Sequence, residues 1–124
     1  MTPAVVCAMR PCSSANAGKL MELIARLEAM LAQGQDSALL RYSLGNEYFK
    51  ARQFTAAVEH LARAVALDPE YSAAWKLYGK TLAENNQIDE AINAYTRGIH
   101  VAELKGDLQA AKEMRIFRKR LKNQ

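Results

Sequence analysis

From Ala38 to Pro69 the chain reads ALLRYSLGNEYFKARQFTAAVEHLARAVALDP, and the same design returns in the next stretch, from Ser72 onward. This repetition sets the fold. Small, apolar and helix-capping residues recur together at one constant spacing, which we call the repeat period. The matched pairs are Gly45 with Gly79, Tyr48 with Leu82, Thr55 with Asp89, Ala57 with Ala91, Leu61 with Tyr95, and Ala64 with Gly98. Self-similarity at a fixed period of this length indicates a stacked repeat architecture.

Helical periodicity also extends beyond the two copies. Apolar residues in Lys19–Ala32 recur at helical spacing and predict an amphipathic helix. We expect one domain with a flanking helix at 18–33, a first repeat at 38–71, a second repeat at 72–105 and a C-terminal capping helix at 107–122. With two helices in each repeat, the fold is all-α with about six helices. Connections of two to five residues make neighbouring helices antiparallel.

Polar residues and glycines mark the expected helix ends. The candidate N-caps are Asp36 or Ser37, then Thr55, Ser72, Asp89 and Asp107, and Gly34 is expected to end the first helix. Pro69 excludes helical geometry at the residue before it, which ends the first repeat. Glu103 stands at the corresponding place in the second repeat. We therefore expect that helix to continue to about Leu104 or Lys105, with Gly106 just beyond it.

The repeated positions match a known pattern, W-x2-L-G-x2-Y followed by A-x3-F and then P. In the first copy these positions are Arg41, Leu44, Gly45, Tyr48, Ala57, Leu61 and Pro69, and in the second they are Trp75, Tyr78, Gly79, Leu82, Ala91, Tyr95 and Glu103. Only Arg41 and Glu103 depart in chemical character. The chain thus resembles two tetratricopeptide repeats flanked by half-repeats, over about residues 18–122. The resemblance implies a solenoid of antiparallel helix pairs.

The small residues of the repeat have a packing reason. Gly45 with Ala57, and Gly79 with Ala91, are expected where the two helices of one repeat approach closely. A larger side chain there would force the helices apart, at a cost of about 1–3 kcal/mol. Ala64 and Gly98 would similarly admit the first helix of the next repeat.

Composition and the N-terminal stretch narrow the class of protein. Of 124 residues, half are apolar and about a quarter are charged, as in ordinary soluble domains. The apolar segment Ala4–Met9 is too short for a secretory signal, and no apolar run approaches the length of a membrane span. We expect a cytoplasmic protein with a disordered leader at 1–17 and no membrane partner. Cys7 and Cys12 lie in that leader and complete no zinc site, so no metal or cofactor is expected.

The resemblance implies a protein-interaction scaffold whose concave groove is lined by the first helix of each pair. Transferring the groove positions residue by residue gives Leu39, Tyr42, Asn46, Phe49 and Lys50, then Lys76 and Lys80, and finally Met114, Phe117 and Arg118. Aromatic side chains beside lysine and arginine favour a protein or peptide partner with apolar anchors and acidic character.

No group of residues has the pattern of a catalytic site. His60 and His100 do not share a repeat position, and the glycines are isolated rather than gathered in a phosphate-binding loop. We therefore expect no catalytic residues, and a protein that is not an enzyme.

Two alternative functions stay open. From Lys105 to the C-terminus, basic residues outnumber acidic ones by seven to two, and Lys112, Arg115, Lys119 and Lys122 share one side of a helix. Such a stripe can contact phosphates, which makes nucleic acid or another polyanion a less favoured partner. The other alternative is self-association through the 18–33 helix, which lacks a partner helix. The expected state is a monomer or a weak dimer.

Overall fold

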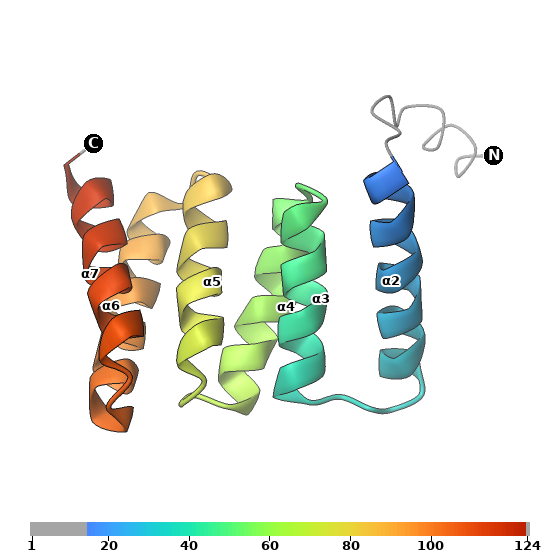
Figure 1. Ribbon diagram of the computed structural model, residues 1–124, viewed down its shortest axis with the longest axis horizontal. Coiled ribbons are helices and arrows are strands. Elements are labelled where there is room, and N and C mark those ends of the chain that lie inside the picture. The colour runs from blue at the N-terminus through green and yellow to red at the C-terminus, as the bar shows by residue number, and fades with distance from the viewer. Residues whose placement is uncertain (1–14, 124) are drawn as a thin grey trace.

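A computed structural model describes residues 15–123, and over that range it contains six α-helices and no strand (Figure 1). The helices are α2 Ala15–Ala32, α3 Ala38–Lys50, α4 Phe54–Leu67, α5 Ser72–Glu84, α6 Ile88–Lys105 and α7 Leu108–Lys122. The expected all-α helix-pair solenoid is confirmed. Helix α2 begins at Ala15, slightly before the expected boundary. The rest of the expected leader, with both cysteines, lies outside the described residues.

The helices form two rows. In Figure 1, α3, α5 and α7 lie toward the viewer, and α4 and α6 lie behind them. Helix α3 packs on α4, α5 on α6, and α6 on α7, while α4 also contacts α5. Each repeat therefore supplies one helix to each row, and the last helix α7 continues the front row without a helix of its own behind it in the described chain.

The short turns between the helices of one repeat are equivalent in the two copies. Arg52 and Asn86 occupy the same repeat position, and both adopt a left-handed backbone, with φ of 62° and 64°. Asparagine tolerates this conformation better than most residues, and the same turn in both copies returns each second helix against its first. Equivalent positions of the two repeats thus have nearly the same φ angle in this turn.

The N-cap predictions are only partly confirmed. The Ser37 hydroxyl accepts from the Leu40 amide at 3.2 Å, and the Asp107 carboxylate accepts from the Ala110 amide at 3.4 Å. Thr55, Ser72 and Asp89 are not N-caps, because their helices begin earlier and place all three inside the first turn. Ser72 instead donates its hydroxyl hydrogen to Asp107 at 3.0 Å, which ties the start of α5 to the start of α7.

Glycines mark the closest approaches between helices. A Cβ at Gly45 would lie 2.4 Å from the side chain of Leu61, and a Cβ at Gly79 would lie 2.6 Å from the ring of Tyr95. At Gly98 an added Cβ would meet Met114 at 2.6 Å and the Cβ of Trp75 at 2.7 Å. The first two contacts join the helices of one repeat, and the third admits α7. These positions follow the packing expected from the sequence.

The second repeat ends as expected from its missing proline. Helix α6 continues to Lys105, and Gly106 follows with φ of 79°, in the left-handed region that glycine adopts without strain. Glu103, which stands at the proline position, forms an ion pair with Arg115 of α7. The longer α6 therefore provides extra surface for docking the last helix.

A polar cluster attaches α2 to the first repeat. The Tyr48 hydroxyl donates to Glu28 at 2.7 Å, and the Tyr48 ring stacks on the His60 ring with centroids 5.4 Å apart. Arg41 donates to Nδ1 of His60 at 3.1 Å, so the imidazole proton sits on Nε2, which lies 3.5 Å from Glu28. Burial, reinforced by Glu28, raises the pKa of Tyr48 to about 12. Arg41 therefore has a structural role where the repeat pattern calls for tryptophan.

The close approach at Gly79 predicts a stability change. We expect Gly79→Ala to lower the free energy of unfolding by about 1–3 kcal/mol, since its methyl group would overlap a ring that is only 2% exposed. Urea unfolding followed by circular dichroism measures the change. Gly18→Ala is the control, because a Cβ at Gly18 meets nothing within 4 Å. Equal destabilisation by both substitutions would contradict the packing argument.

The polar cluster predicts a pH dependence of stability. Burial is the main cause that lowers the pKa of His60, and Arg41 adds to it, while Glu28 and Glu59 oppose it. A histidine with a lower pKa in the folded state binds protons more readily when unfolded. Its contribution to stability is therefore complete above its unfolded pKa of about 6.5 and is lost as the pH falls below that value.

This pH dependence can be assigned to His60 by substitution. Between about pH 7.5 and pH 5.5, we expect the melting temperature of the unmodified chain to fall further than that of His60→Gln. His100→Gln, at an exposed position in α6, should behave like the unmodified chain. If the pH dependence survived in His60→Gln and disappeared in His100→Gln, the assignment would be wrong.

Candidate functional site

The front row of helices encloses a hollow of about 350 Å³, which we call the front hollow. Its lining comes from α3, α5 and α7: Tyr42, Ala73, Lys76, Leu77, Lys80, Glu113 and Phe117. Four of the groove residues expected from the sequence, Tyr42, Lys76, Lys80 and Phe117, therefore meet around one space. They come from three helices that are distant in sequence.

The charges of the front hollow are unequally compensated. Lys76 lies 2.7 Å from Glu113, and this hydrogen bond is the main cause that lowers the pKa of Glu113. Lys80 places its Nζ 5.4 Å from the centre of the Phe49 ring and forms no ion pair within residues 15–123. The lysine charge that the described chain leaves uncompensated in this hollow is thus that of Lys80.

Aromatic rings form the apolar part of this surface. Tyr42 packs against Tyr71 with ring centroids 5.0 Å apart, and Phe49 meets the edge of Phe54 at 5.4 Å. Phe117 packs near Tyr95, with centroids 5.9 Å apart. Because each ring is held by a neighbour, the surface offers apolar area at little cost in side-chain entropy.

Three expected groove residues lie beside the front hollow rather than in it. Leu39 is 65% exposed and borders a separate hollow between α2 and α3. Lys50 lies 3.6 Å from Glu47 and borders a hollow that faces α2. Asn46 is half-buried and is not part of the lining.

Two expectations on α7 are wrong. Met114 has no exposed surface and lies in the core against Gly98, so it cannot contact a ligand. Arg118 donates to the Thr96 hydroxyl at 3.2 Å and is therefore held toward α6. Both assignments came from a strict count by the repeat period, which the longer α6 makes invalid for the last helix.

The same shift explains the residue that sequence reasoning missed. Glu113 pairs with Lys76 across 37 positions of the chain, which is three positions beyond the residue that the repeat period matches with Lys76. At that spacing Phe117 takes the place relative to Lys80 that Glu113 takes relative to Lys76. Glu103 at the proline position already indicated that α6 would be longer. Which residues α7 then turns toward α5 depends on how the helices pack.

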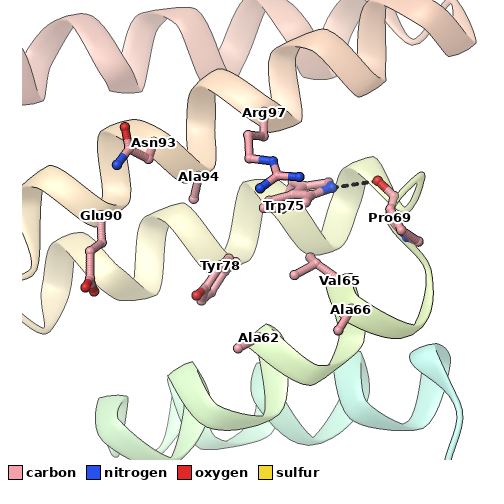
Figure 2. A pocket seen from close by; sticks show the side chains of 10 residues that line it. All are labelled: Ala62, Val65, Ala66, Pro69, Trp75, Tyr78, Glu90, Asn93, Ala94 and Arg97. Carbon is pink, nitrogen blue, oxygen red and sulfur yellow. Dashed lines mark hydrogen bonds between the residues drawn. The ribbon is translucent and has the colours of Figure 1, made fainter.

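A second cavity of about 560 Å³ lies between α4 and α6 and is lined on a third side by α5 (Figure 2). We call it the back cleft. Its lining is Ala62, Val65, Ala66, Pro69, Trp75, Tyr78, Glu90, Asn93, Ala94 and Arg97. The indole of Trp75 donates to the carbonyl of Pro69 at 2.7 Å, and the Arg97 guanidinium lies 5.3 Å above the indole. Burial, with Glu90 nearby, raises the pKa of Tyr78. Trp75 and Tyr78, which match the repeat pattern in the sequence, thus also line this cleft.

One charge of the expected basic stripe on α7 is compensated within the chain. Lys112, Arg115 and Lys119 are all exposed, and Arg115 is paired with Glu103. Over residues 15–123, no helix is long and apolar enough to cross a membrane, and no three potential metal ligands lie together.

Comparison with known proteins places these features in a family. A TPR repeat-containing protein of Pseudomonas aeruginosa, PA0015, is 46% identical over 99 residues, which cover 80% of this chain and 94% of that protein. A solution structure from Bordetella parapertussis is 46% identical and has a TM-score of 0.70 over 81% of this chain and 87% of the other. A Salinibacter ruber tetratricopeptide repeat domain is 25% identical, with a TM-score of 0.66 over 71% of this chain and 89% of its own.

The model of the tetratricopeptide repeat family matches residues 42–107, which is more than half of the chain. This range includes most of α3, all of α4, α5 and α6, and the glycines at which these helices approach each other. The repeat spacing, the helix pairing and the relatives agree: the chain belongs to the tetratricopeptide repeat family.

Proposed function

We propose that the front hollow binds a peptide segment of a partner protein. Proteins of this family are generally non-catalytic scaffolds for protein–protein interaction. The observation that carries the proposal is the meeting of Tyr42, Lys76, Lys80 and Phe117, from three front helices, around one space. A few aromatic and cationic anchors around a hollow are what a peptide-binding surface needs.

The lining also defines the chemistry of the partner segment. The aromatic walls favour an apolar side chain as the anchor. Lys80 favours an acidic residue next to that anchor, whereas Lys76 is already paired with Glu113. One apolar anchor with one neighbouring carboxylate therefore fits this surface better than a run of acidic residues.

Charge reversal at Lys80 tests the proposal. Peptides are first selected from a random display library against the full chain, and their affinities are measured by fluorescence polarisation. We expect Lys80→Glu to weaken the best peptides about tenfold or more, because it replaces an attraction with a repulsion at the hollow. Lys112→Glu, an equal charge change at an exposed position of α7, should leave the affinity within about twofold.

The matched control also separates the alternative partners. If Lys112→Glu weakened binding as much as Lys80→Glu, the front hollow would not be the peptide site. Binding of generic RNA at about 50 mM salt, lost in Lys112→Glu combined with Lys119→Glu, would support the α7 surface instead. Melting temperatures of all variants show whether a loss of binding reflects unfolding.

A further inference from the structure

The back cleft, between α4 and α6, has a counterpart between α2 and α4, and two side chains that occupy the counterpart are replaced by alanines in the cleft. By the same repeat period that matches Gly45 with Gly79, Glu28 corresponds to Ala62 and His60 corresponds to Ala94. Glu28 of α2 accepts from Tyr48 at 2.7 Å, and its carboxylate lies 3.5 Å from His60 of α4. These side chains occupy the space between α2 and α4.

Between α4 and α6 the same space is left open. Figure 2 shows Ala62 and Ala94 on opposite sides of Tyr78, where each presents only a methyl group to the cleft. A cavity of about 560 Å³ is within the size range of small-ligand and side-chain pockets. The floor is apolar and aromatic, so an apolar group fits it.

The two spaces also differ in how the arginine beside them is paired. Arg63 and Arg97 occupy equivalent positions of the repeat period. Arg63 lies 3.8 Å from Asp36, a carboxylate that also pairs with Arg41 at 2.8 Å. Arg97 lies over the Trp75 ring and forms no ion pair with any residue in the described part of the chain. The chain thus supplies a carboxylate to this guanidinium position in the first repeat, and the described residues supply none in the second.

We propose that the back cleft binds a segment of a partner protein in which an apolar side chain lies next to a carboxylate. The apolar side chain enters between Ala62 and Ala94 onto Trp75, and the carboxylate pairs with Arg97. The guanidinium stacked on the indole keeps its N–H groups available for two parallel hydrogen bonds. This site shares helix α5 with the front hollow but none of its lining residues, so it does not depend on the proposed function.

Glu90 restricts how such a segment can lie. In Figure 2 it stands at the end of the cleft away from Arg97, where its carboxylate accepts from Gln87. A ligand carboxylate placed there would meet like charge, so the two ends of the cleft give the bound segment one direction.

Trp75 is the only tryptophan of the chain, so its indole N–H signal in NMR reports on the back cleft alone. The probes are N-acetyl-phenylalanine, which carries the carboxylate, and N-acetyl-phenylalaninamide, which lacks it. We expect the acid to shift the Trp75 signal with a Kd on the order of 1 mM, as for a ligand of this size. The amide should bind roughly tenfold more weakly, because it forms no ion pair with Arg97.

Three variants identify the groups responsible. Arg97→Gln should make the acid and the amide bind alike, whereas Arg63→Gln, the equivalent change one repeat earlier, should preserve the difference. Ala62→Glu with Ala94→His installs the residues that occupy the space between α2 and α4, and it should abolish the shift by both probes. Thermal unfolding shows which variants are folded, and Arg97 is exposed, so its replacement does not disturb the core.

Three outcomes would overturn the proposal. One is the absence of a Trp75 shift with the acid at roughly ten times the expected Kd. Another is equal binding of the acid and the amide by the unmodified chain. The third is an equal loss of preference in Arg63→Gln and Arg97→Gln.

Discussion

The close packing of a side chain on a glycine backbone is the contact on which the rest of the structure depends. Tyr95 lies on Gly79, Leu61 lies on Gly45, and Met114 lies on Gly98. Each contact fixes how far apart two helices lie and which face each one turns inward. In α5, the face of Gly79 points to the back row, so Lys76 and Lys80 are left on the front row. The front hollow is thus a consequence of packing on the opposite side of the same helices.

The repeat period predicted the helix pairs, the close approaches and the lining residues Tyr42, Lys76 and Lys80. It also placed Leu39, Asn46 and Lys50 of α3 in the groove, although they lie beside the front hollow. On α7 it was misleading in another way. The missing proline at Glu103 was enough to predict a longer α6, but not that Met114 of α7 would be the residue packed on Gly98. For that reason Met114 was assigned to the groove and Glu113 was missed. Counting residues by the repeat period cannot tell which face of α7 is buried, because the helix before it is longer than its counterpart in the first repeat.

Local capping chemistry was also an incomplete guide. Asp107 and Ser37 cap their helices, but Ser72 stands inside its first helical turn and bonds to Asp107 instead. Side chains that can cap a helix can equally bond to another segment, and tertiary contacts decide which happens. The same holds for Arg41, which departs from the repeat pattern in sequence but is bonded to both Asp36 and His60 in the structure.

The two copies therefore share a backbone design but differ in how much of their charge the chain compensates. Around the first repeat, Asp36 and Glu28 meet the nearby cationic and polar groups, and the space is filled. In the front hollow, Glu113 compensates Lys76 and leaves Lys80. In the back cleft, Arg97 has no partner carboxylate among the described residues. Lys80 and Arg97 are both exposed cations that lie over an aromatic ring, and the chain supplies neither with a carboxylate among the described residues. Each cation therefore gives its surface a preference for an acidic group on the ligand, and the aromatic rings beside it add a preference for an apolar one.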